Sequence, residues 1–112
     1  MKHPEFLEID IGKYGGPVYI GREKGKAIRD KFGLDSVDSS ETRVCVLIPD
    51  NTYSINSSYF LSLFGPSIRA AGSRDAFLDK YEFRGPPSVW ETIDSCISRA
   101  LHEKTALFDK NK

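Results

Sequence analysis

The sequence predicts an α/β domain in which helices pack on a small mixed sheet. Segments with the two-residue period of a strand and segments with the 3.6-residue period of a helix follow one another along the chain. The longest apolar run, Val44 to Ile48, suits a strand that is covered on both faces. The C-terminal segment carries a wide apolar stripe at helical spacing. We therefore expect a central strand whose connections on either side are helical.

The N-terminal segment predicts two short strands. In "EFLEIDI" the apolar residues Leu7, Ile9 and Ile11 occupy every second position, which is the period of a half-buried strand. The turn-forming segment "GKYGGP" follows, and after it comes the short apolar segment "VYI". We expect these two strands to form a hairpin.

The next segment, "GREKGKAIRDKFGL", predicts a helix. Gly25, Ile28 and Phe32 recur at helical spacing, and Gly33 stands where a C-cap belongs. A glycine in a helix costs about 1 kcal/mol relative to alanine, so we expect this helix to approach the sheet closely at Gly25. The basic residues lie all round the helix and alternate with acidic ones, which is typical of solvated side chains; they are Arg22, Lys24, Lys26, Arg29 and Lys31.

The middle of the chain predicts a loop, the central strand and a second helix. The polar segment "LDSVDSSET" is the expected loop, and Val44 to Ile48 is the strand. The second helix has an apolar face that consists of Phe60, Leu63, Phe64, Ile68 and Ala71. Gly65 and Pro66 interrupt this face, and proline lacks the N–H that a helix interior requires. We expect a break or a kink there.

The C-terminal third predicts a short helix, a last strand and a final helix. "SRDAFLDK" is the short helix with Ser73 as its cap, and "YEF" is the strand. Ser88 and Glu91 have the spacing of a capping box at the start of the final helix. The apolar stripe of that helix consists of Val89, Trp90, Ile93, Ile97, Ala100 and Leu101.

Length and charge limit the function. A chain of 112 residues has room for one domain with a modest core. Sixteen basic residues balance sixteen acidic ones, so no net field attracts nucleic acid or an anionic membrane. The start of the chain has no apolar signal region, and no apolar run is long enough to cross a bilayer. We expect a soluble, cytoplasmic protein.

The sequence contains no clear constellation for catalysis or for a cofactor. Its two cysteines, Cys45 and Cys96, and its two histidines, His3 and His102, are isolated from one another, so we expect no metal site. "GREKGKA" lacks the spacing and the hydroxyl residue of a phosphate-binding loop, and no serine lies in a nucleophile elbow. Asp50 is the one carboxylate that stands out for inspection. These observations favour a protein without enzymatic activity and without a cofactor.

Three segments resemble a known family. "INSSYFLSLFGPSIR", with Ile55, Ser58 and an aromatic residue after it, resembles the hallmark "I-t-x-S-F-x-x-x-L-F-G" of the STAS-like domain of unknown function. STAS denotes the sulphate transporter and anti-sigma factor antagonist domain. The first predicted helix resembles that family's "R-x-x-G-x-x-[IL]-R" helix through Arg22, Gly25, Ile28 and Arg29. "FLDKYEF" resembles the family's stretch before its last helix, so that the resemblance covers nearly the whole chain.

The resemblance implies a fold and a function. Residues 1–112 would form a single STAS-like sandwich. Anti-sigma factor antagonists carry "D-S-S-G" at the start of the corresponding helix, where a histidine-kinase-like ATPase phosphorylates a serine. Asn56, Ser57, Ser58 and Tyr59 fall on that site, with Asn56 in place of the acidic residue and Tyr59 in place of the glycine. The implied function is a bacterial or phage-borne regulatory domain that binds such an ATPase until Ser58, or in second place Ser57, is phosphorylated.

The sequence also offers secondary candidate residues and leaves alternative functions open. Arg22 and Gly25 would belong to a second face, and Asp50 is nearest to the acidic residue that the family places after its central strand. The serines alternatively serve only as N-caps, since serine and asparagine are preferred there. Two other functions remain, namely a small enzyme or nucleotide-binding protein, and a structural homodimer with a seam of exposed Tyr53 and Tyr59.

Overall fold

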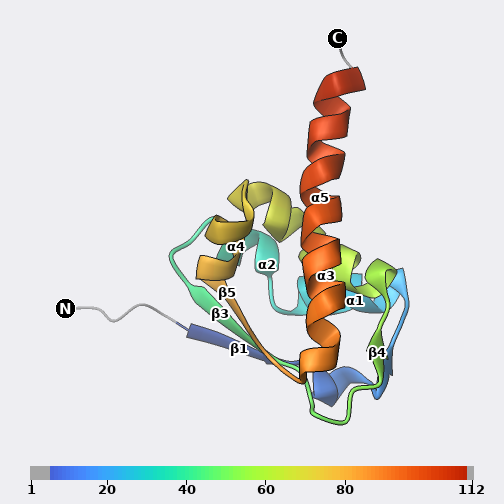
Figure 1. Cartoon of the computed structure of the whole chain (residues 1–112). Coiled ribbons are helices and arrows are strands. Elements are labelled where there is room, and N and C mark those ends of the chain that lie inside the picture. The colour runs from blue at the N-terminus through green and yellow to red at the C-terminus, as the bar shows by residue number, and fades with distance from the viewer. Residues whose placement is uncertain (1–5, 111–112) are drawn as a thin grey trace, which may run out of the picture.

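The chain folds around two parallel sheets. A computed structural model describes the backbone of residues 6–110 and the side chains of residues 6–102. One sheet has three parallel strands in the order β1 (Phe6–Asp10), β3 (Arg43–Leu47), β5 (Tyr81–Arg84), and the other pairs β2 (Val18–Tyr19) with β4 (Ser54–Ile55), also in parallel (Figure 1). The predicted α/β class and the central position of β3 are confirmed. The predicted mixed sheet is wrong, because every strand pair in the described residues is parallel.

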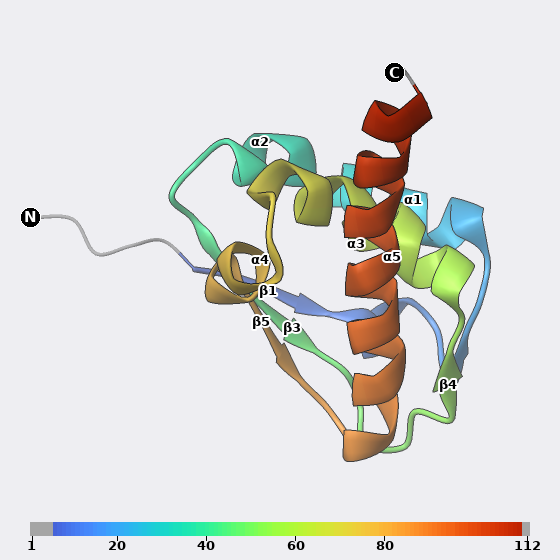
Figure 2. The ribbon, with the colours of Figure 1, turned by 45° about the horizontal axis from the view of Figure 1, so that its top comes forward.

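Five helices complete the described chain, and Figure 2 shows them gathered on one side of the three-stranded sheet. They are α1 (Arg22–Lys31), α2 (Leu34–Asp38), α3 (Ser57–Ala71), α4 (Arg74–Lys80) and α5 (Trp90–Lys110), and two short 3-10 turns, η1 (Ile11–Tyr14) and η2 (Pro87–Val89), precede β2 and α5. In the part of the chain that the structure describes, none of these helices is long and apolar enough to cross a membrane.

The predicted hairpin is wrong. The first strand, β1, pairs with β3, and β2 pairs with β4 in the second sheet. The reason lies in η1, which begins where the Asp10 carboxylate accepts a hydrogen bond from the Gly12 N–H at 2.9 Å. The turn buries Ile11, and Gly16 then takes a positive φ of 105° that favours glycine. The chain is thereby led away from β1 instead of folding back along it.

The helices cover only one face of the three-stranded sheet. Val44 and Val46 of β3 point into the core beside Tyr81 and Phe83 of β5. Cys45 between them is half-buried, and its neighbours across the strands on that outer face are charged and exposed. The expectation that β3 is covered on both faces is therefore wrong. A continuous apolar run fits such burial, but the charged residues of the flanking strands keep this face open to water.

The α3 helix supplies the centre of the core. The ring of Phe64 lies 5.1 Å from that of Phe60, 5.2 Å from that of Phe83 and 5.6 Å from that of Tyr81, measured between centroids. The helix runs without interruption through Gly65 and Pro66, so of the two predicted alternatives, a break or a kink, the break does not occur. Buried side chains on both sides of Pro66 pack into the same core, and this packing outweighs the hydrogen bond that proline cannot make.

Gly25 marks the contact between α1 and α3. A side-chain carbon at Gly25 would overlap with the backbone carbonyl oxygen of Tyr59 and with the hydroxyl of Ser62, both on α3. The sequence correctly predicts a close approach at this glycine, but the approach is to α3 and not to the sheet. The two helices therefore pack backbone against backbone, and the start of one is fixed relative to the start of the other.

Arg29 is buried, which corrects its interpretation as a solvated residue. Its guanidinium donates to the Leu63 carbonyl oxygen at 2.9 Å and to the Ser67 hydroxyl at 2.8 Å. It also pairs with the carboxylates of Asp35 at 2.6 Å and Asp38 at 2.9 Å. Burial lowers the pKa of the Arg29 guanidinium, but the two carboxylates more than offset this, so its pKa is raised. The positive charge of Arg29 is thus stabilised inside the protein by hydrogen-bond and ion-pair partners on α2 and α3.

The carboxylate of Asp38 completes this network. It accepts hydrogen bonds from the Ser67 hydroxyl at 2.6 Å and from the Tyr81 hydroxyl at 2.6 Å. Burial, together with the bond to Asp38, raises the pKa of Tyr81. The segment predicted as a loop after Gly33 contains α2, which begins at the left-handed Gly33 and delivers Asp35 and Asp38 to Arg29. The predicted C-cap at Gly33 is off by one residue, because the C-cap of α1 is Phe32 and Gly33 is the N-cap of α2.

The C-terminal elements agree with expectation apart from one cap. Ser73 caps α4 by accepting from the Ala76 N–H at 3.1 Å. The final helix buries Ile93, Ile97 and Ala100 of the predicted stripe, and it also buries Cys96. Ser88 lies inside η2, whose N-cap is Pro86, so the predicted capping box is wrong.

Replacing Gly25 by alanine should destabilise the protein by about 2 kcal/mol. The clash with a backbone carbonyl cannot be relieved by a rotamer change, and overpacking of this kind costs about 1–3 kcal/mol. Urea denaturation followed by circular dichroism measures the change. Lys24→Ala, at an exposed position of the same helix, is the control and should shift the unfolding free energy by less than about 0.5 kcal/mol. A stabilised Gly25→Ala variant, as helix propensity alone would produce, would contradict this packing.

Replacing Arg29 by methionine should lower the unfolding free energy by about 3–5 kcal/mol, because Asp38 would be left as a buried, unpaired charge. Adding Asp38→Asn should recover part of the loss, and denaturation of the two variants measures that coupling. Lys26→Gln removes an exposed ion pair on the same helix and should cost at most about 0.5 kcal/mol. Equal losses for Arg29→Met and Lys26→Gln would show that the buried network contributes nothing.

Candidate functional site

The starts of α1 and α3 lie side by side at one edge of the small sheet. Because β2 and β4 are parallel, the helices that follow them begin at the same end of the strands. The backbone N–H of Asn56 donates to the carbonyl oxygen of Tyr19 at 2.8 Å and so joins the two strand exits. Arg22, the first residue of α1, and Ser58, in the first turn of α3, consequently line the same groove.

Asn56 is the N-cap of α3. Its side-chain oxygen accepts a hydrogen bond from the Ser58 N–H at 2.8 Å. Ser57 and Ser58 are the first two residues of the helix, so the prediction that they begin it is confirmed. The alternative in which their hydroxyls act only as caps is wrong, because Asn56 performs that task. The hydroxyl of Ser57 instead accepts from the Arg99 guanidinium at 3.2 Å, and Ser58 is exposed to solvent.

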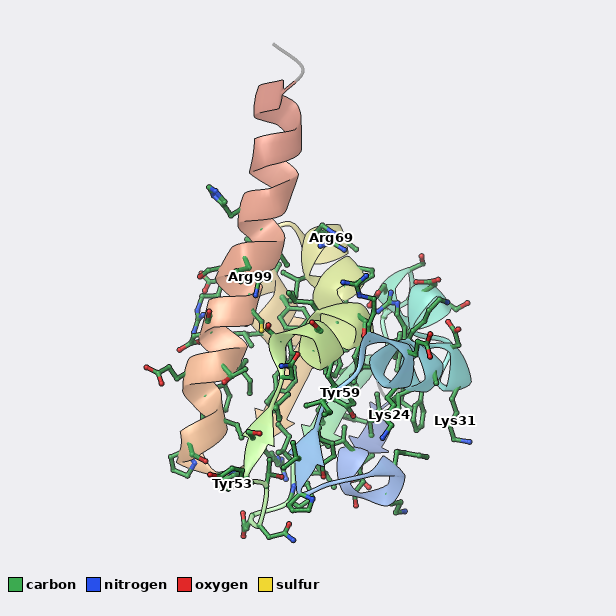
Figure 3. The ribbon with its side chains drawn as sticks, turned by 90° about the vertical axis from the view of Figure 1, so that its right-hand side faces the viewer. Lys24, Lys31, Tyr53, Tyr59, Arg69 and Arg99 are labelled. Carbon is green, nitrogen blue, oxygen red and sulfur yellow. The ribbon has the colours of Figure 1, made fainter. Side chains whose placement is uncertain are left out.

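A second groove runs from this helix start between α1, α3 and α5. It has a volume of about 260 Å³ and is lined by Arg22, Ser57, Ser58, Leu61, Ser62, Arg69 and Arg99. No carboxylate lines it. Figure 3 shows Arg69 of α3 and Arg99 of α5 on the same face of the molecule, with Lys24 of α1 further along that face. The groove therefore combines hydroxyl groups with positive charge.

Tyr59 does not belong to this surface. Only 3% of it is exposed, and its ring lies 5.6 Å from that of Tyr19 between centroids. Within the described residues its hydroxyl has no hydrogen-bond partner, and burial raises its pKa, with a smaller contribution from Tyr19. The prediction of Tyr59 as an exposed, partner-binding residue is wrong, because this side chain is buried in the core beside Tyr19 of β2. Tyr53, in contrast, is 82% exposed as expected.

The other two secondary candidates, Gly25 and Asp50, lie away from the groove around Ser58. Gly25 is buried between α1 and α3, where it sets the distance between the helices. Asp50 is exposed and lines a different groove, which lies at the carboxyl ends of the three-stranded sheet together with Asp10 and Arg84. Of the secondary candidates, only Arg22 therefore shares a groove with Ser58.

Sequence reasoning missed Arg69 and Arg99. Both lie on the polar side of helices whose apolar stripes were identified, and in the sequence they look like ordinary solvated residues. Nothing in the sequence singles them out, because helical spacing places each of them well away from the apolar stripe of its helix. Arg69 shares α3 with the serines, whereas only the packing of α5 against α3 brings Arg99 to them.

The cysteines and histidines show no metal site in the described residues, where no three His, Cys, Asp or Glu side chains gather closely enough to bind an ion. Cys45 and Cys96 are both free thiols, and burial raises the pKa of each. His102 is exposed, and His3 lies outside the described residues.

Comparison of the chain with known protein families, with curated proteins and with solved structures finds no match.

Asn56→Ala should lower the unfolding free energy by about 1 kcal/mol, because the Ser58 N–H loses its acceptor. Ser57→Ala and Ser58→Ala should each change it by less than about 0.5 kcal/mol, since neither hydroxyl caps the helix. Thermal and urea unfolding of the three variants provide the comparison. If Ser58→Ala lowered the unfolding free energy as much as Asn56→Ala does, the Ser58 hydroxyl and not Asn56 would be the cap.

Proposed function

We propose that this protein is a non-enzymatic regulatory domain that binds a histidine-kinase-like ATPase and is switched by phosphorylation of Ser58. The observation that carries the proposal is the exposure of Ser58 in the first turn of α3, with its hydroxyl released from capping by Asn56. The resemblance of residues 55–69 to the STAS-like hallmark supports the identity of the partner.

The surroundings of Ser58 favour binding over chemistry. The groove that Ser58 shares with Arg69 and Arg99 has no carboxylate or histidine that would act as a general base, and the other groove that Ser58 lines holds one carboxylate, that of Glu23. Burial also holds the neighbouring segment firmly, since Tyr59 and Phe60 anchor the first turn of α3 in the core. A partner would thus contact a rigid helix start, and phosphorylation of Ser58 would change the charge of that surface.

Phosphorylation would change this surface without unfolding it. A phosphoserine adds between one and two negative charges near neutral pH and three acceptor oxygens. At a helix N-terminus such a group is tolerated by the folded chain, because the backbone dipoles there favour negative charge. A partner that docks against the positive groove would lose its electrostatic complementarity.

Ser58→Asp should weaken binding to the ATPase at least about tenfold, because it places a negative charge where the groove is positive. The same variant should leave the unfolding free energy within about 0.5 kcal/mol of wild type. Binding is measured with the tagged chain immobilised and a purified ATPase partner recovered from the host, and stability is measured by urea unfolding. Ser36→Asp, an exposed serine in α2, is the matched control and should bind like wild type.

Incubation with the purified partner and ATP should add one phosphoryl group to wild type and none to Ser58→Ala, as measured by intact mass. Modification of Ser57 alone would show that Ser57, and not Ser58, is the phosphorylated residue. Unchanged binding of Ser58→Asp together with no phosphoryl transfer would refute the proposal. A rise in melting temperature of the isolated chain with ATP would instead favour a nucleotide-binding protein.

A further inference from the structure

We infer that the groove between α1, α3 and α5 is a phosphoryl-binding site, in which Arg22 and Arg99 hold a phosphoryl group carried by Ser58 of the same chain. The source of the phosphoryl group rests on the function proposed above. The positive groove itself is independent of that function, since it follows from the positions of the arginines and serines.

The charge of the groove supports an anionic occupant. Three of its seven lining residues are arginines, three are serines and none is acidic. An anion that enters this groove is attracted by the guanidinium groups of Arg22 and Arg99. Arginine binds phosphoryl groups better than lysine does, because its planar fork donates two parallel hydrogen bonds.

The geometry places the modification site within reach of these cations. Arg99 already donates to the Ser57 hydroxyl at 3.2 Å, so its guanidinium lies over the first turn of α3. Arg22, the first residue of α1, and Ser58 line the same two grooves, one of which also holds Glu23 and Lys24. A phosphoryl group on Ser58 would therefore lie in the groove that Arg22 and Arg99 line.

The serine acquires the group by an ordinary transfer. The Ser58 oxygen forms a bond with the γ-phosphorus of a nucleoside triphosphate bound by the partner, and the bond from that phosphorus to the β–γ bridging oxygen breaks. A nucleoside diphosphate leaves, and the hydroxyl proton passes to solvent. The product carries a phosphoryl group with three acceptor oxygens for the two guanidinium forks.

Binding in the groove would have two consequences for the switch. The phosphoryl group would bridge α1 and α5 across the start of α3, which adds stability in the modified state. It would also occupy Arg22 and Arg99 and neutralise part of the positive surface that a partner meets. Modification would then withdraw two cations from the partner in addition to adding negative charge.

The test uses the full chain produced with phosphoserine genetically incorporated at position 58. Phosphorus NMR across a pH titration reports the second pKa of that group, and calorimetry reports Tm. We expect the phosphoserine pKa to lie below its usual value of about 6, and Tm to exceed that of the unmodified chain by about 4 °C. Both effects should vanish in Arg22→Gln/Arg99→Gln. They should persist in Lys26→Gln, an exposed cation of α1 that does not line the groove.

The outcomes separate this inference from the proposed function. An unshifted phosphoserine pKa, or one equally shifted in Arg22→Gln/Arg99→Gln, would overturn the inference even if phosphorylation still abolished binding to the ATPase. A shifted pKa that depends on the two arginines, with unchanged ATPase binding, would support the site and refute the proposed function.

A second arm titrates inorganic phosphate into the unmodified chain and follows the backbone amides of α1 and α3. Binding that Arg22→Gln/Arg99→Gln abolishes supports the phosphoryl-binding groove. The same binding combined with an unshifted phosphoserine pKa would overturn Ser58 as the source, and would leave free phosphate as the occupant.

Discussion

The buried guanidinium of Arg29 is the interaction on which the arrangement of the helices depends. It joins three elements at once, because it extends from α1, bonds to Leu63 and Ser67 on α3, and pairs with Asp38 on α2. A buried charge is costly unless it is paired and hydrogen-bonded, so this arrangement tolerates few alternatives. The network continues through Asp38 to Tyr81 on β5 and thereby ties the helical layer to the sheet.

The candidate site is a consequence of the same constraint. Arg29 and Gly25 lie on one face of α1, and both contact α3, so the two helices are fixed in register as well as in distance. The parallel pairing of β2 with β4 then places both helix starts at one edge. Arg22 and Ser58 line the same groove because their helices are held in place by these other contacts.

Sequence patterns anticipated the elements better than their pairing. The alternation of Leu7 and Ile9, the apolar run after Arg43 and the stripe of α5 each predicted the right element, because local spacing sets which face is apolar. The hairpin failed, since strand pairing depends on contacts between residues distant in sequence. The break at Pro66 failed for a related reason: packing on both sides of the proline holds the helix together.

For the candidate site, too, the sequence predicted the local structure but not the neighbours in space. Local chemistry alone indicated a helix start at Ser57 and Ser58, because asparagine and serine before an aromatic run favour one. Tertiary packing decided which side chains surround it: it buried Tyr59, buried Arg29 among carboxylates and brought Arg99 to the serines. Burial and charge pairing are properties of neighbours in space, and a single sequence does not record which distant residues those neighbours are.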